Sequence, residues 1–315
     1  MSAPRLVIGT RGSALALWQA HHIKERLEAY GATIEVRVIK TQGDKIQDAP
    51  LARIGGKGLF IKEIEQALAA REVDLAVHSM KDVPAALPPG LVIAAVPERA
   101  DARDVLIGRT EKTLDQLPQG ALVGTSSLRR ICQLRARRPD LRIEMLRGNV
   151  DTRLRRLDEG RFDAIVLAAA GLARLGHTAR VTEYLAPEVS LPAIGQGALA
   201  IEVRAGDAEV EPLVRRLDHE PSARAVAAER AFLTRLGGSC QTPLAAYATW
   251  DAGTLALDGM VGRTDGTEIV RDHIGGAAWS AEDLGRTLAE RLLERGAARI
   301  LADLAAAAAA DAGSA

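Results

Sequence analysis

Short apolar runs alternate with segments of helical spacing along this chain as far as about residue 204. Runs such as 6–9, 75–77, 122–124 and 164–167 have the length and composition of buried strands. Between them, apolar residues recur at intervals of three and four, which is the helical period. Because such alternation is typical of α/β folds, the pattern predicts two α/β domains with largely parallel sheets.

The two predicted α/β domains share the chain unevenly. Domain 1 is expected to cover residues 1–98 and to regain residues 197–216 after a chain crossing near 192–197, and domain 2 is expected to cover 99–196. The expected strands are 6–9, 34–39, 75–77, 91–96, 122–124, 143–146, 164–167 and 198–203, and the expected helices are 13–30, 59–70, 128–138 and 150–159.

The pattern changes after about residue 216. One helix, three strands separated by Asp/Gly turns and a second helix predict a small α+β domain with an antiparallel three-stranded sheet over residues 217–304. These five elements are expected at 222–236, 244–248, 254–261, 268–274 and 280–295. The Ala-rich tail, 305–315, is assigned no function.

Arginines concentrate in the middle of a chain whose formal net charge is zero. They are Arg129, Arg130, Arg135, Arg137, Arg138, Arg142, Arg147, Arg153, Arg155, Arg156 and Arg161. A guanidinium group matches the geometry of carboxylates and phosphates. The cluster therefore predicts a site for a ligand with several negative groups.

Composition excludes several other kinds of protein. No apolar run approaches the ~18 residues of a membrane span, and residues 1–10 lack the features of a secretory signal, so we expect a cytoplasmic protein without a membrane partner. The two cysteines form no disulfide framework and no zinc-like spacing, so no metal is expected. The zero net charge argues against general nucleic-acid binding.

Two turns at equivalent places in the two α/β units have the residues of anion sites. In residues 9–13, glycines permit a tight turn and Arg11 and Ser13 add donors ahead of a helix N-terminus. Residues 124–130 repeat this arrangement, with the candidate donors Thr125, Ser126, Ser127, Arg129 and Arg130. A helix cap beside a solvent-exposed arginine remains the alternative for each turn.

Other candidates follow strands or lie in loops. Asp82 and Lys81 follow the strand at 75–77, where ligands bind in α/β folds, although a surface turn would look the same. Arg147 lies at a strand-to-helix turn, and Arg153 follows in the next helix. Cys240 lies in a glycine-rich loop and is either an accessible nucleophile or an inert thiol.

These segments together resemble the porphobilinogen deaminase family, also called hydroxymethylbilane synthases. The resemblance covers nearly the whole chain except the Ala-rich tail. It is carried by IGTRGS at 8–13, GGKGLF at 55–60, HSMKDVP at 78–84, GTSSLRR at 124–130, LRGN at 146–149, LPAIGQG at 191–197 and GSC at 238–240.

The resemblance implies a transferase that joins four porphobilinogen molecules head to tail into hydroxymethylbilane, releasing ammonia at each step. It implies a covalent dipyrromethane cofactor on Cys240, Asp82 as the catalytic carboxylate, and a monomer whose product passes to a cyclising synthase. Cofactor binding is expected of Lys81, Thr125, Ser126, Ser127, Arg129, Arg130 and Arg147. Substrate binding is expected of Arg11, Ser13, Lys57, Phe60, Arg147, Arg153, Arg174 and Gln196. The implied fold has two type II periplasmic-binding-protein-like domains and a third domain that carries Cys240.

Two rival functions remain. A solute-binding protein shares the double α/β architecture, but the absence of a signal segment and the loop position of Cys240 count against it. A nucleic-acid-binding regulator would use the arginine segment, but aromatic residues make up only 3% of the chain and no helix-turn-helix pattern is present.

Overall fold

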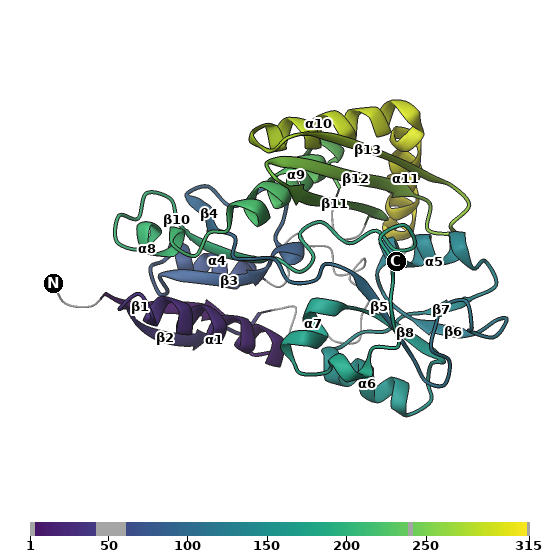
Figure 1. The fold of residues 1–315 in the computed structure, drawn as a ribbon, viewed down its shortest axis with the longest axis horizontal. Coiled ribbons are helices and arrows are strands. Elements are labelled where there is room, and N and C mark those ends of the chain that lie inside the picture. Colours follow the sequence, from purple (N-terminus) through teal and green to yellow (C-terminus); the bar gives the residue numbers. More distant parts are fainter. Residues whose placement is uncertain (1–3, 42–60, 239–241, 314–315) are drawn as a thin grey trace.

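The computed structural model describes residues 4–41, 61–238 and 242–313, which form three domains, each built on one sheet (Figure 1). In the view of Figure 1, domain 1 lies at the left, domain 2 at the lower right and domain 3 above both. None of the helices in these residues is both long enough and apolar enough to cross a membrane.

Domain 1 has a five-stranded sheet in the order β2-β1-β3-β10-β4. Its strands are β1 (Arg5–Thr10), β2 (Thr33–Val38), β3 (Leu75–Ser79), β4 (Leu91–Ala95) and β10 (Leu199–Arg204), and its helices are α1 (Ala14–Glu28), α4 (Lys62–Ala69) and α8 (Glu211–Arg215). Ser13 caps α1 as predicted, because its side chain accepts a hydrogen bond from the Ala16 amide. The fully buried Ile8, Ile23 and Ile201 belong to the core between the sheet and its helices.

Domain 2 repeats this architecture with the order β7-β6-β8-β5-β9. Its strands are β5 (Asp104–Gly108), β6 (Leu122–Gly124), β7 (Arg142–Glu144), β8 (Ala164–Ala168) and β9 (Glu183–Tyr184), and its helices are α5 (Leu128–Arg137), α6 (Val150–Asp158) and α7 (Ala169–Arg174). Strand β5, which lies next to the edge strand β9 in this sheet, was not among the strands predicted from the sequence.

The prediction of largely parallel sheets is confirmed, with one exception in each sheet. Four of the five strands run in one direction, whereas β10 pairs antiparallel with β3 and β4, and β5 pairs antiparallel with β8 and β9. Each of these strands comes from the neighbouring domain along the chain. It enters beside the carboxyl end of a parallel strand, as the pairings Leu199 to Ser79 and Asp104 to Ala168 show, and so must run in the opposite direction.

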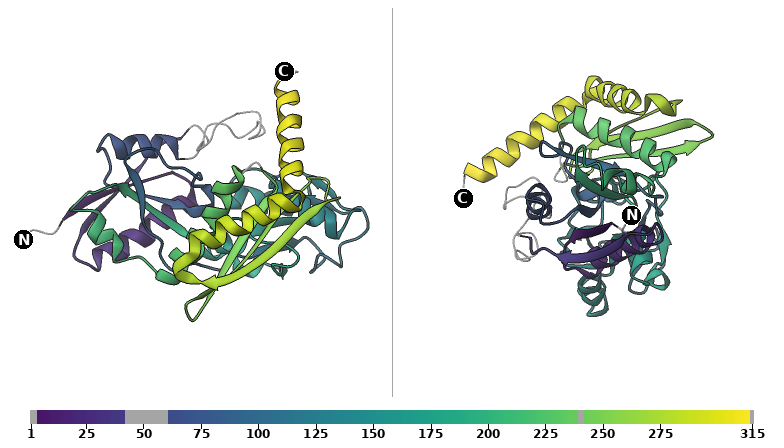
Figure 2. Two further views of the ribbon diagram at one scale, coloured as in Figure 1. Left: turned by 90° about the horizontal axis from the view of Figure 1, so that it is seen from above. Right: turned by 90° about the vertical axis from the view of Figure 1, so that its left-hand side faces the viewer.

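Domain 3 confirms the predicted antiparallel three-stranded sheet. The strands β11 (Leu244–Asp251), β12 (Thr254–Gly262) and β13 (Ile269–Ala277) pair in this order, and the helices are α9 (Glu220–Leu236), α10 (Ala281–Leu292) and α11 (Ala298–Gly313). Phe232 and Leu288 are fully buried among the helices and the sheet. Helix α11 runs through residue 304, where the tail was expected to begin, and projects away from the other elements (Figure 2).

Candidate active site

The turn after β3 fixes Asp82. Met80–Asp82 forms a 3-10 turn in which Met80 is buried and donates its amide to the Ala198 carbonyl at 3.0 Å, while the Val83 amide donates to the Met80 carbonyl at 3.1 Å. Gly195 packs directly against this turn with a φ of 67°, and a Cβ at Gly195 would lie 2.4 Å from Cγ of Met80. Only glycine therefore allows the crossing chain to lie so close to the turn.

Asp82 shares a pocket with the first predicted turn. Arg11, Ser13, Gln19 and Ser79 line it together with Asp82. The Gln19 amide donates to the Ser79 hydroxyl at 2.8 Å, which links α1 to the end of β3. The structure thus brings three candidates of the sequence analysis, Arg11, Ser13 and Asp82, to one pocket.

Lys81 points toward domain 2. Its ammonium group lies 3.5 Å from the side-chain oxygen of Gln196, whose amide donates to Asp104 at 2.9 Å and to the Ala102 carbonyl at 2.6 Å. Burial lowers the pKa of Lys81 to about 8; Asp82 opposes this shift and Arg130 adds to it. Lys81 is therefore within the electrostatic influence of Asp82 from domain 1 and Asp104 from domain 2. A further anion beside it would stabilise its charged form.

Asp104, at the start of β5, is the residue that sequence reasoning missed. Arg129 donates to its two oxygens at 2.6 and 3.1 Å, Arg130 donates at 2.7 and 3.0 Å, and the Ser190 hydroxyl donates at 2.7 Å. Burial of Asp104 disfavours its charge, yet the two guanidinium groups hold its pKa well below the usual range. An acid that opens a five-residue apolar run inside an arginine-rich region was the available signal.

The structure gives Arg129 and Arg130 an internal counter-charge that the sequence did not suggest. Both side chains are buried and both contact Asp104. Their predicted contact with a cofactor stays a prediction. Of the neighbouring candidates, Thr125 is buried, Ser126 donates its hydroxyl to the Leu146 carbonyl at 2.8 Å, and Ser127 precedes the first turn of α5.

Arg147, Arg153 and Arg174 differ from that pair, because within the described residues none of the three forms a salt bridge. One terminal nitrogen of Arg147 is buried without a hydrogen-bond partner there. Arg153 donates to the Gly148 carbonyl at 2.8 Å, and Arg174 donates to the Gly197 carbonyl at 2.7 Å.

Two of these arginines also have pKa values below the usual range of arginine. Burial lowers the pKa of Arg153 to about 10, with further lowering by Arg130 and Arg147 and an opposing effect of Asp82. Burial lowers the pKa of Arg174 to about 10 as well. Half-buried cations that form no salt bridge within the described residues fit a ligand that carries several carboxylates.

The sequence matches two known protein-family domains. Residues 6–212 match the family described as porphobilinogen deaminase, dipyromethane cofactor binding domain, and residues 223–294 match the porphobilinogen deaminase C-terminal domain. The chain belongs to the porphobilinogen deaminase family.

Curated relatives cover nearly the whole chain. Porphobilinogen deaminase of Syntrophotalea carbinolica is 54% identical over 306 residues, which are 96% of this chain and 97% of the relative. That of Syntrophobacter fumaroxidans is 55% identical over 300 residues, 94% of this chain and 97% of the relative. Among solved structures, the second substrate-binding domain of a putative amino acid ABC transporter from Streptococcus pneumoniae is 14% identical, with a TM-score of 0.44 over 74% of this chain and 94% of its own.

Three site residues predicted from the porphobilinogen deaminase resemblance, Lys57, Phe60 and Cys240, lie outside the described residues. Cys132 is described and is fully buried in α5, and burial raises the pKa of its thiol to about 12. It is therefore an inert, packed thiol. Within the described ranges no group of three or more His, Cys, Asp or Glu side chains could hold a metal ion.

Proposed function

We propose that this chain is a hydroxymethylbilane synthase. It joins four porphobilinogen molecules head to tail, releasing one ammonia per molecule joined, and one water then hydrolyses the finished tetrapyrrole from the enzyme as hydroxymethylbilane. The observation that carries the proposal is that Asp82 lies on a fixed turn while half-buried arginines, Arg147, Arg153 and Arg174, have no salt-bridge partner in the described part of the chain. Family membership gives this arrangement its substrate.

The proposed cofactor is dipyrromethane, held through a thioether to Cys240. When bound, it supplies a pyrrole α-carbon to which the first porphobilinogen is joined. We assign its carboxylates to Lys81, Arg147, Arg129 and Arg130, with hydroxyl and amide donors from Thr125, Ser126 and Ser127. Two observations support this assignment. One nitrogen of Arg147 has no hydrogen-bond partner among the described residues, and the pKa of Lys81 is lowered. A nearby carboxylate would accept a hydrogen bond from the first and stabilise the charge of the second.

Asp82 is proposed to act on the reacting atoms. As the carbon–nitrogen bond of porphobilinogen breaks, positive charge develops on the remaining pyrrole, and the Asp82 carboxylate stabilises it. A carbon–carbon bond then forms between the methylene carbon and the α-carbon of the growing chain. That α-carbon loses its proton, and Asp82 is the group placed to accept it.

The substrate-binding residues are proposed to hold carboxylates rather than reacting atoms. Each porphobilinogen carries an acetate and a propionate, so a growing chain brings two negative charges at every step. We assign these groups to Arg11, Ser13, Arg147, Arg153, Arg174, Lys57 and Gln196, with Phe60 as a further contact to substrate. The side chain of Gln196 already bonds Asp104 and the Ala102 carbonyl, so it would orient Lys81 as well as contact substrate.

Further parts of the proposal concern the whole molecule. We propose a cytoplasmic monomer that passes its product to a cyclising synthase, because a linear tetrapyrrole must be closed by a later reaction. The domain boundaries near residues 98, 196 and 216 belong to the same proposal, and size-exclusion chromatography with limited proteolysis would test the oligomeric state and these boundaries.

Intact mass of the denatured protein tests the proposed function directly. Protein from a porphobilinogen-competent host should carry the added mass of two linked pyrroles, and porphobilinogen should add further single-pyrrole increments. Cys240→Ala should lack this mass, whereas Cys132→Ala, the matched control at a buried thiol, should keep it. A bare wild-type mass with no increments would refute the proposal.

A further inference from the structure

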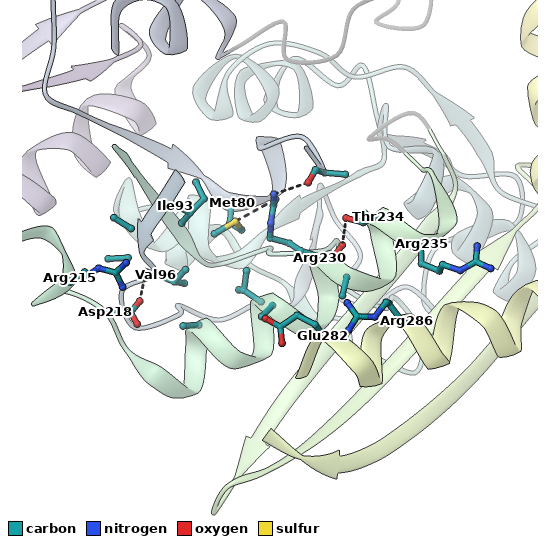
Figure 3. A pocket seen from close by; sticks show the side chains of 17 residues that line it. Met80, Ile93, Val96, Arg215, Asp218, Arg230, Thr234, Arg235, Glu282 and Arg286 are labelled. Atoms are coloured by element: carbon teal, nitrogen blue, oxygen red, sulfur yellow. Dashed lines mark hydrogen bonds between the residues drawn. The ribbon is translucent and has the colours of Figure 1, made fainter. Parts of the chain in front are cut away.

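Arg230, in the middle of α9, binds the chain directly after Asp82. Its Nη2 donates to the Pro84 carbonyl at 2.9 Å and to the Ala85 carbonyl at 3.2 Å. Its Nη1 lies 3.5 Å from the Val83 carbonyl and 3.9 Å from the sulfur of Met80 (Figure 3). One side chain from domain 3 thus holds both ends of the turn that carries Asp82.

The carbonyls that Arg230 contacts belong to no strand or helix. Residues 83–90 lie between the 3-10 turn and β4 without regular structure. Within the described residues, the carbonyls of 83–85 accept no hydrogen bond from a backbone amide. Arg230 therefore supplies a constraint that the local backbone of this segment lacks.

The helix that carries Arg230 is itself anchored. The neighbouring Glu229 is fully buried and accepts hydrogen bonds from Arg99 at 2.6 Å, from the Gly195 amide at 2.6 Å and from the Ala248 amide at 2.8 Å. These contacts tie α9 to both chain crossings and to β11. Arg230 thus connects the catalytic turn to a helix that has little freedom to move.

Arg230 also borders a cavity that lies behind the turn. The cavity, of about 830 Å³, is lined by Met80 and residues of β4 on one side and by α9 and α10 on the other (Figure 3). It opens to solvent. If the Arg230 guanidinium were removed, water could therefore reach the carbonyls of residues 83–85. These carbonyls would then accept hydrogen bonds from water instead of remaining buried without a donor.

We propose that Arg230 is a positioning residue for Asp82. It holds the Asp82 turn against α9, which Glu229 fixes to both chain crossings and to β11, so one side chain sets the place of the catalytic carboxylate. The inference rests on the proposed function of Asp82 and Cys240. Catalysis is sensitive to displacements of about 1 Å, so this role affects turnover more than substrate binding.

Two variants with one matched control test the proposal. Arg230→Met keeps the length of the side chain but removes its donors, and Arg230→Gln keeps one donor group. Arg235→Met is the control, since Arg235 lies on the same helix but is exposed and pairs only with Glu290 at 3.1 Å among the described residues. For each protein, we would measure kcat, KM for porphobilinogen, the intact mass and the amide hydrogen exchange of residues 80–87.

Arg230→Met should lower kcat roughly 10- to 100-fold with KM changed less than about 2-fold. Its pyrrole mass should be retained, and exchange at 80–87 should be faster than in the wild type and in Arg235→Met. Wild-type kcat in Arg230→Met, an equal loss in Arg235→Met, or a loss confined to KM would each overturn the proposal. Should Arg230→Met not fold, Arg230→Gln is judged by the same criteria.

Failure of the proposed function would look different. In that case the wild-type protein would form no hydroxymethylbilane and carry no pyrrole mass, whatever stands at position 230. Failure of the positioning role alone would leave the wild type active and Arg230→Met equally active.

Discussion

Removing the charge of Asp104 should destabilise domain 2 strongly. Asp104→Asn keeps the shape of the side chain but leaves Arg129 and Arg130 buried without a counter-ion. Breaking a buried ion pair by neutralising one partner costs about 3–5 kcal/mol. For a domain of about 100 residues that corresponds to a fall in Tm of roughly 12–40 °C.

The assay is thermal unfolding followed by circular dichroism at pH 7, with Asp115→Asn as the control. Asp115 pairs with Arg137 at 3.1 Å in the same domain, but both side chains are exposed, at 67% and 54%. The control should unfold within about 2 °C of the wild type, because exposed pairs contribute little. A Tm of Asp104→Asn as close to the wild type as that of Asp115→Asn would refute the reasoning.

The pH dependence of this effect has a definite sign. Since the pKa of Asp104 is lowered in the folded protein, its contribution to stability is fully present above the unfolded value of about 3.9. It is lost only as the pH falls through the lower, folded value. The stability difference between wild type and Asp104→Asn should therefore be constant from pH 5 to 8, and a difference that grows with pH across this range would contradict the assigned charge state.

Three further predictions concern the site and the chain crossings. Asp82→Asn should keep KM near wild type and lower kcat about 10²- to 10⁴-fold, with Asp82→Glu less impaired; normal turnover by Asp82→Asn would remove its catalytic assignment. Because the pKa of Lys81 is about 8 without the cofactor, its charge falls as the pH rises from 7 to 9, so citrate should bind the primer-free Cys240→Ala protein more weakly over this range, and less so when Lys81→Met is added; parallel profiles would exclude Lys81 from anion binding. Glu229→Gln should lower the free energy of unfolding by about 3 kcal/mol in denaturant titration, since it breaks the buried pair with Arg99, and an unchanged midpoint would contradict this.

The sequence predicted the elements that have strong local signals. Helix α5 and strand β6 lie where expected, and the N-cap of α1 was predicted because a serine before a helical pattern has a local mechanism. Strand β5 was missed although its residues are apolar, since its place in the sheet depends on a chain crossing. The direction of β10 was missed for the same reason, because strand pairing is decided by contacts between distant segments.

The site was predicted by residue type but not by partner. Asp82, Arg11 and Ser13 lie on turns at the ends of parallel strands, so the sequence indicated their meeting. The division of the arginines could not be predicted. Asp104 neutralises Arg129 and Arg130, whereas Arg147 and Arg153 have no such partner in the described residues, and this difference arises only when the crossing strand β5 brings Asp104 beside α5.

That division has an energetic consequence for the proposed cofactor. Arg147, Arg153 and Arg174 are partly desolvated in the folded protein and form no salt bridge within the described residues, which opposes folding and closure around them. A ligand that binds only the folded state stabilises it, and a covalent ligand does so without dissociating. The carboxylates of a covalent cofactor near these cations would therefore stabilise the folded protein, in addition to the cofactor's role as a primer. The primer-free Cys240→Ala protein should accordingly melt below the wild type and regain part of the difference with a polycarboxylate such as citrate, and equal melting temperatures would show that these cations find their counter-charge elsewhere.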